Sequence, residues 1–214
     1  MLDEDTSRHV VQVLRMKPKE TLQLTNGAGT LLTVEIVDDH KKKCTVAVTD
    51  VVHFPPKKQV VSVAISLLKN AGRFEWFLEK ATEIGVSEII PILCERTEKQ
   101  HFRFDRMQQI LISAMMQSKQ VWLPVLHPPR PFCEAVISSI YETKLVAHCL
   151  EENKLSIADF RHSASVQVLI GPEGDFSKEE ISIALHHSYK PVSLGTTRLR
   201  AETAGVVAAT MLCV

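Results

Sequence analysis

The chain has 214 residues, of which 45% are hydrophobic, and its 25 basic side chains balance 25 acidic ones. This length is enough for one large domain or two small ones with a proper core. Because the longest apolar runs fall well short of the roughly 20 residues that span a bilayer, we expect no membrane span. The acidic N-terminus, "MLDEDTSRHV", lacks the basic and apolar regions of a secretory signal, which favours a cytoplasmic protein.

The first 54 residues predict a small β-barrel, which we assign to a domain at residues 1–54. Residues 9–16, "HVVQVLRM", read as a short helix. Two predicted strands in which apolar and polar residues alternate, "TLQLT" and "TLLTVEIV", flank the turn Asn26–Gly29. This pattern predicts a hairpin. A third strand, "CTVAVTDVV", follows a charged connection, and the paired prolines and lysines of residues 53–59 then read as a linker.

Strands and helices alternate along residues 58–214, which predicts an α/β domain with a parallel sheet and helices on its faces. We expect strands at 60–66, 88–93, 144–150, 166–171 and 191–194, and helices at 73–85, 104–119, 131–140, 177–188 and from about 200.

Five cysteines are scattered along the chain, and no two of them form a Cys-x-x-Cys pair: Cys44, Cys94, Cys133, Cys149 and Cys213. Their odd number and wide spacing argue against both a disulfide framework and a zinc site. We therefore expect reduced thiols and no metal.

The stretch "VLIGPEGDFSKEEI" takes a strand into a glycine loop and then into a helix. It has neither the Gly-Lys-Ser/Thr of a Walker loop nor the Gly-x-Gly-x-x-Gly of a dinucleotide loop. The loop carries Glu173 and Asp175, which suits a ligand that is neutral or cationic where it meets the loop. Ser177 and Glu180 form a capping box that fixes the next helix start. A ligand-binding loop and a plain tight connection both remain possible from these residues alone.

A second glycine loop, in "SLGTTRLRAETAGVVAAT", again lies between a strand and a helix. Arg198 and Arg200 would oppose the dipole of that helix, whereas Glu202 would complement it, so the arginines call for another explanation. The small residues of the helix permit close packing, either inside the domain or against a partner subunit. At a third strand exit lies His148, which the residues alone favour as a core histidine over a catalytic base.

Charge is unevenly distributed along the balanced chain. Residues 55–130 carry 11 basic and 7 acidic side chains, a net charge of +4, between two slightly acidic flanks. A solvated surface explains this excess about as well as an RNA-binding groove does.

Four segments together resemble the RsmE family of ribosomal RNA methyltransferases, which belong to the SPOUT class. They are "HVVQVLRMKP", "FLEKATEIGVSEIIPILCERT", "IGPEGDFS" and "LGTTRLRAETA", and they occur in the family's order across nearly the whole chain. The resemblance implies a PUA-like, RNA-binding barrel followed by a SPOUT domain with a parallel sheet and a trefoil knot. It further implies S-adenosylmethionine as the cofactor, a homodimer through the knotted domain, and no metal.

The same resemblance assigns roles to individual residues. The implied reaction is methylation of uridine at N3 in small-subunit ribosomal RNA, with the RNA or the assembled small subunit as partner. Arg200 would stabilise charge on the base, and Glu202 would hold Arg200, contact the donor or act as a base. The implied cofactor-binding residues are His148, Cys149, Ile170, Gly171, Pro172, Glu173, Gly174, Leu194, Gly195, Leu199 and Thr203. The implied RNA-binding residues are Arg15, Lys69, Arg73 and Arg96.

Three departures from the family pattern accompany these expectations. Gln120 replaces an arginine, Asp175 replaces a frequent glycine, and the chain begins close to the family's first helix, so that the first strand of the barrel is expected to be short or missing. Two alternatives therefore stand beside the main reading: a noncatalytic RNA-binding relative, and a SPOUT methyltransferase that acts on another RNA site. A nucleotide-dependent enzyme is least favoured, because both loops lack a phosphate-binding pattern.

Overall fold

The computed structural model describes residues 1–150 and 153–214, and the chain folds as two compact units, 1–56 and 57–214. The first unit begins with α1 (Glu4–Arg8), which continues as a π-helical segment, η1 (His9–Val13). This helix starts earlier than the predicted 9–16, because the Asp3 side chain caps it by accepting a hydrogen bond from the Thr6 N–H at 2.8 Å. It ends before Arg15, which has a positive φ of 56°.

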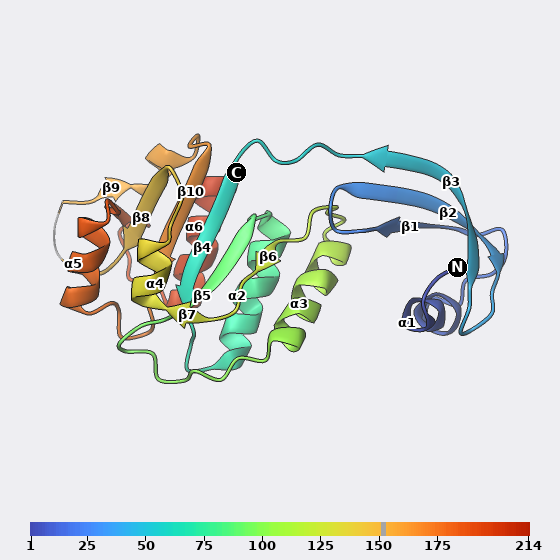
Figure 1. Ribbon diagram of the computed structural model, residues 1–214, viewed down its shortest axis with the longest axis horizontal. Coiled ribbons are helices and arrows are strands. Elements are labelled where there is room, and N and C mark those ends of the chain that lie inside the picture. Colours follow the sequence, from blue (N-terminus) through green and yellow to red (C-terminus); the bar gives the residue numbers. More distant parts are fainter. Residues whose placement is uncertain (151–152) are drawn as a thin grey trace. The chain divides into compact units, whose positions relative to one another are not determined.

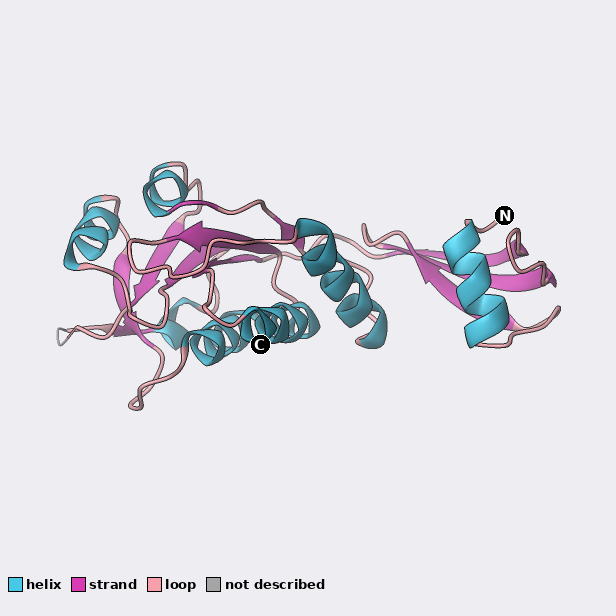
Figure 2. Cartoon of the chain, turned by 90° about the horizontal axis from the view of Figure 1, so that it is seen from below, coloured by secondary structure: helices cyan, strands magenta, loops and turns pink. Residues whose placement is uncertain are grey.

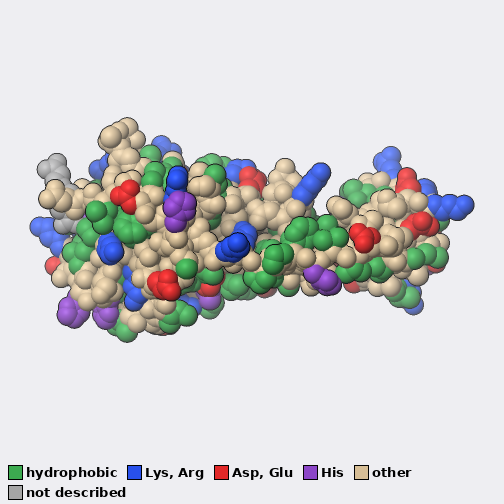
Figure 3. Space-filling view, turned by 90° about the horizontal axis from the view of Figure 1, so that it is seen from above, with side chains coloured by type: hydrophobic (Ala, Val, Ile, Leu, Met, Phe, Trp, Pro, Cys, Tyr) green, Lys and Arg blue, Asp and Glu red, His purple; other side chains and the backbone are tan. Residues whose placement is uncertain are grey.

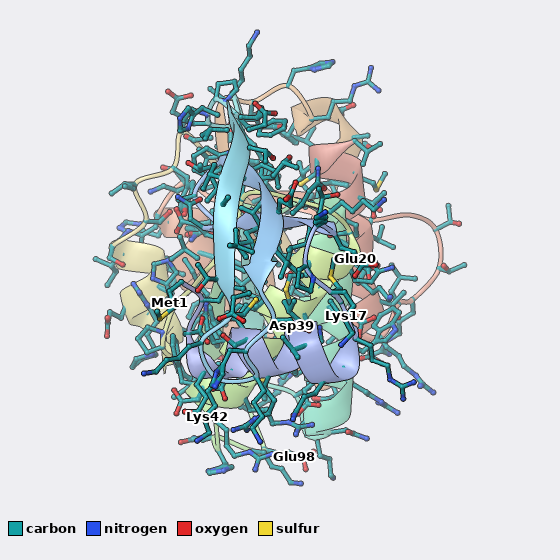
Figure 4. All side chains as sticks on the ribbon, turned by 90° about the vertical axis from the view of Figure 1, so that its right-hand side faces the viewer. Met1, Lys17, Glu20, Asp39, Lys42 and Glu98 are labelled. Atoms are coloured by element: carbon teal, nitrogen blue, oxygen red, sulfur yellow. The ribbon has the colours of Figure 1, made fainter. Side chains whose placement is uncertain are left out.

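Three antiparallel strands follow in the order β1 (Thr21–Thr25), β2 (Thr30–Asp38) and β3 (Thr45–His53). The predicted hairpin is confirmed, and the Asn26 side chain stabilises it by accepting hydrogen bonds from two backbone N–H groups. The unit has a small buried core of Val10, Ile36 and Cys44. Exposed contacts such as that between Lys17 and Asp39, at 3.3 Å, lie at its surface (Figure 4).

The second unit contains an eight-stranded sheet in which every described strand pairing is parallel, as predicted (Figure 1). Its neighbouring strands, in order, are β6 (Val125–Leu126), β5 (Glu88–Leu93), β4 (Val60–Ser66), β10 (Ser165–Ile170), β8 (Thr143–Ala147), β11 (Lys190–Ser193) and β9 (Leu155–Ser156), with β7 (Arg130–Pro131) also beside β5. The central strands β4 and β10 are buried along almost their whole length, as expected for a sheet covered on both faces.

Helices cover both faces of this sheet (Figure 2). One buried cluster joins the sheet to α2 (Ala71–Ile84), α3 (Phe104–Gln117), the 3₁₀ turn η2 (Ile157–Phe160) and α6 (Ala201–Cys213). A second cluster joins the opposite face to α4 (Phe132–Ile137) and α5 (Lys178–His186). None of the described helices is long and apolar enough to cross a bilayer.

The predicted elements differ from the observed ones mainly at their ends. The strands expected at 60–66 and 88–93 have those bounds. The helix expected at 73–85 begins earlier, at Ala71, because the Asn70 side chain caps it. The helix expected at 131–140 ends at Ile137, where the Ser138 hydroxyl donates to the carbonyl of Glu134. The prediction missed β6, β7 and β9, which are only two residues long and carry no periodic pattern.

Candidate functional site

Three neighbouring strands of the sheet, β10, β8 and β11, end at the same edge because they are parallel. The loops that follow them enclose a cavity of about 850 Å³, which we call the strand-exit cavity. Ten of the predicted site residues line it, from all three loops: His148, Cys149, Ile170, Gly171, Pro172, Glu173, Leu194, Gly195, Leu199 and Arg200. The structure therefore brings together loops that lie far apart in the sequence.

The loop after β10 is a fixed turn. A Cβ at Gly171 would lie 3.1 Å from the Phe176 nitrogen and 3.2 Å from its ring, which is tighter than most Cβ contacts, so a larger residue here would force Phe176 to move. The Asp175 N–H donates to the carbonyl of Pro172 at 2.9 Å. Beyond the turn, Ser177 and Glu180 form the predicted capping box at the start of α5. The backbone of the loop is thus held at both ends.

Asp175 links this loop to the loop after β8. Its Oδ2 accepts a hydrogen bond from the Cys149 N–H at 2.8 Å, and its Oδ1 accepts one from the Phe176 N–H at 2.8 Å. Its φ of 65° is left-handed, a conformation that aspartate tolerates better than most residues. A glycine here would adopt the same backbone but could not make either bond, so this departure from the family pattern adds a contact.

Residues that follow β4 and β5 contact the glycine loop from its outer side. The Glu173 side chain accepts a hydrogen bond from the backbone N–H of Lys69 at 3.1 Å, and the Lys69 ammonium lies 2.7 Å from Glu98. The Arg96 guanidinium donates to the carbonyl of Gly174 at 2.7 Å. Gly174 accordingly faces Arg96 and is absent from the lining of the strand-exit cavity.

The loop after β11 ends at α6, with Arg200 as the N-cap residue in an extended conformation. Helix α6 packs inside the domain: a Cβ at Gly205 would lie 2.6 Å from the ring of Phe77 on α2. Arg200 therefore lies at the start of a helix that packs tightly against α2. Together with Arg198 it lines the strand-exit cavity.

A second pocket of about 380 Å³ lies where α2 and α6 begin, and we call it the helix-start pocket. Its lining is Asn70, Gly72, Arg73, Trp76, Arg200, Glu202 and Thr203. Two predicted site residues, Glu202 and Thr203, line this pocket and are absent from the lining of the strand-exit cavity. Glu202 is 6% exposed, and its Oε1 lies 3.6 Å from Nε of Arg73.

The strand-exit cavity contains charges of both signs but no activated thiol. Burial raises the pKa of the Cys149 thiol, and the nearby Asp175 carboxylate raises it further, so Cys149 stays protonated near neutral pH.

Lys154, which the sequence analysis missed, lines the cavity and donates to the carbonyl of His148 at 2.6 Å. No group of three or more metal-ligating side chains occurs among the described residues. The site is suited to non-covalent binding of a polar small molecule.

Comparisons with known families match both units. Residues 55–213 match the RNA methyltransferase domain, and residues 2–49 match the RNA methyltransferase PUA domain. Among curated proteins, the chain is 28% identical over 209 residues to the ribosomal RNA small subunit methyltransferase E of Rickettsia conorii, covering 94% of this chain and 83% of the relative.

Solved structures show the same fold over nearly the whole chain. A probable rRNA-methyltransferase from Porphyromonas gingivalis has a TM-score of 0.92 at 36% identity, covering 99% of this chain and 92% of that one. The ribosomal RNA small subunit methyltransferase E of Neisseria gonorrhoeae, bound to S-adenosyl methionine, has a TM-score of 0.88 at 29% identity, covering 97% of this chain and 88% of that one.

Proposed function

The chain belongs to the RNA methyltransferase family, and we propose that it transfers a methyl group from S-adenosylmethionine to N3 of a uridine in small-subunit ribosomal RNA. The observation that carries the proposal is the strand-exit cavity, where three parallel strands place their loops around one space with Arg200 at its border. The names of the related proteins, which are ribosomal RNA small subunit methyltransferases, support the RNA class.

The residues of the strand-exit cavity fit S-adenosylmethionine. The cofactor has no phosphate, and neither glycine loop has a phosphate-binding pattern. It carries positive charge at its sulfonium and amino groups, and Glu173 and Asp175 supply carboxylates at the glycine loop. The backbone of Ile170–Pro172 and of Leu194–Gly195 can approach the adenosine closely. When bound, the cofactor supplies the methyl group, and these residues orient it.

Arg200 is the residue that we assign to charge stabilisation. The N3 proton of uracil has a pKa roughly two units above neutral, so the site must supply on the order of 3 kcal/mol to favour the anion. A guanidinium beside the carbonyl oxygens of the base stabilises that charge. Arg200 lines both the strand-exit cavity and the helix-start pocket, and it can therefore contact a base that approaches the donor.

Of the four expected RNA-binding residues, three have partners within the protein. Lys69 pairs with Glu98, Arg73 with Glu202, and Arg96 with the carbonyl of Gly174. Arg15 is exposed in the first unit. On the face shown in Figure 3, basic side chains are dispersed among acidic ones. We propose that RNA contacts come from dispersed charges, with the PUA-like unit as a second binding surface.

We propose that the protein works in the cytoplasm as a homodimer formed through a trefoil-knotted second unit. Family membership supports the knot and the dimer. A face of α6 that is left half-buried or exposed, at Thr203, Val207 and Thr210, supports the dimer further, because these residues lie along one side of the helix. Sedimentation of the purified protein at several concentrations tests the oligomeric state.

The test of the function is calorimetric titration with S-adenosylmethionine, followed in the same preparation by transfer of labelled methyl groups to small subunits that lack the modification. Digestion to nucleosides then identifies the product, and we expect N3-methyluridine. Binding with transfer to a different nucleoside would establish another RNA target. Absence of binding would contradict the assignment of the strand-exit cavity and favour a noncatalytic RNA-binding relative.

A further inference from the structure

Glu202, which lines the helix-start pocket, has a buried acceptor that no described residue satisfies. No described residue donates a hydrogen bond to Glu202 Oε2, and the Oε1 atom has only the ion pair with Arg73 at 3.6 Å, which is too long for a hydrogen bond. Glu202 lies in the first turn of α6, where the helix dipole favours a negative charge. A buried carboxylate with an empty acceptor position lowers stability, and it is retained where a ligand can donate to it.

The charged side chains of the pocket include both a hydrogen-bond acceptor and hydrogen-bond donors. Glu202 is an acceptor, whereas Arg73 and Arg200 are donors that cannot accept. The Watson–Crick edge of uracil presents the opposite pattern, with an N3–H donor between the O2 and O4 acceptors. Cytosine does not match, because its N3 is an acceptor and would face the carboxylate. The pocket thus has the chemistry to distinguish uracil from cytosine.

Trp76 supplies a flat apolar wall beside these polar groups. It lies on α2 one turn after Arg73, lines the pocket and is 43% exposed. Exposed indole rings are stacking platforms for nucleobases. The pocket volume of about 380 Å³ lies within the range of roughly 300–1,000 Å³ that is usual for small-ligand sites.

We infer that the helix-start pocket receives the target uracil, which stacks on Trp76 and is identified by Arg73, Glu202 and Arg200. The inference rests on the proposed function and names the substrate site beside the strand-exit cavity. Arg200 lines both spaces, so a base in the pocket lies next to the methyl donor.

The pocket also gives Glu202 a chemical step. The carboxylate accepts the N3 proton, leaving the negative charge on the uracil, where Arg200 stabilises it. The base then turns its N3 from Glu202 towards the donor, the lone pair on N3 attacks the methyl carbon, the carbon–sulfur bond breaks, and its electrons remain on sulfur to give S-adenosylhomocysteine. Because the same in-plane lone pair holds the proton and forms the new bond, proton transfer precedes attack. Water removes the proton from Glu202 after the product leaves.

Fluorescence of Trp76 tests base binding without depending on activity. The chain has two tryptophans, so Trp122→Phe leaves Trp76 as the only one. In the presence of S-adenosylhomocysteine, uridine 5′-monophosphate should quench the fluorescence, and cytidine 5′-monophosphate should bind about tenfold more weakly. In Glu202→Gln the amide can also donate, so the difference between the two nucleotides should vanish. Equal quenching by both nucleotides in the parent protein, or none by either, would overturn the inference.

Methyl transfer by the full chain gives an independent measurement. In Trp76→Ala the KM for small subunits should rise about tenfold, whereas Trp76→Phe should stay near the wild type, because a ring is retained. Lys80→Ala, one turn further along α2 and outside the pocket, is the matched control. Unchanged KM in Trp76→Ala would overturn the inference while the proposed function stands. Uridine-specific quenching in a protein that transfers no methyl group would leave the pocket assigned and refute the function.

Discussion

The strand-exit cavity and the helix-start pocket are neighbours, but they are built in different ways. The cavity is formed by the loops that follow β8, β10 and β11, and Gly171 lets the loop after β10 turn closely against Phe176. The pocket is formed by side chains from the first turns of two helices that lie about 130 positions apart in the sequence, around Asn70 and Arg200. Backbone sites leave a local signal of glycines and turns, whereas side-chain sites of this kind exist only after the helices have packed.

Arg200 belongs to both spaces, so its removal should have the largest effect. In Arg200→Ala we expect methyl transfer to fall by about 10²–10³-fold, the loss typical of one charge-stabilising donor. Affinity for S-adenosylmethionine should change by only a few-fold, because the backbone of the cavity remains. Single-turnover transfer and calorimetry measure the two quantities, with exposed Arg161→Ala as the control. Unchanged turnover would remove Arg200 from the mechanism and with it the link between the two spaces.

Two glycines of the same loop test whether the cavity depends on backbone approach. In Gly171→Ala the new Cβ would lie 3.1 Å from the Phe176 nitrogen, whereas in Gly174→Ala it would lie 3.4 Å from a carbon of the flexible Arg96 side chain. We expect Gly171→Ala to cost about 1–3 kcal/mol of stability through overpacking and to weaken cofactor binding, with Gly174→Ala close to the wild type. Thermal unfolding and calorimetry check this. Equal effects of both changes would contradict the backbone account.

The Asp175 side chain links two of the loops that line the cavity. Asp175→Ala removes the acceptor for the Cys149 N–H, and the net loss should be about 1 kcal/mol, or about fivefold in cofactor affinity. Asp175→Gly loses the same bond but relieves the left-handed backbone conformation, so it should be the more stable of the two. Calorimetric titration of both variants, beside the wild type, measures the contribution. If both variants bind the cofactor with wild-type affinity, the hydrogen bond between Asp175 and the Cys149 N–H does not contribute to cofactor binding.

Gln120 should have the smallest effect on function. Its side-chain amide donates to the carbonyls of Thr82 at 2.9 Å and Glu83 at 2.7 Å, at the C-terminal end of α2, far along the helix from the pocket. Gln120→Ala should lower the free energy of unfolding by about 1–2 kcal/mol, and Gln120→Arg, the family's residue, should keep donors at this position. Urea unfolding and transfer assays separate the two effects. Lost transfer in a fully folded Gln120→Ala protein would place this residue in RNA binding instead.

Local patterns determined much of this fold. The two apolar runs that became β4 and β5 were predicted with their observed bounds, because buried parallel strands have a continuous apolar pattern. The hairpin at Asn26–Gly29 and the capping box of Ser177 were predicted for a similar reason, since each depends on atoms within four residues. Ten of the site residues that the family resemblance implied line one cavity.

Only the tertiary structure decided which charged side chains form hydrogen bonds or ion pairs within the protein. Arg96 binds the carbonyl of Gly174, 78 positions away, and Glu202 lies against Arg73 on another helix. Lys154 and Asp175 likewise contribute to the cavity through contacts that cannot be predicted from their spacing in the sequence. A hydrogen-bond partner far along the chain depends on how the whole sheet and its helices pack. The sequence by itself therefore determined the strands and the glycine loops, and packing determined the side-chain partners of the site.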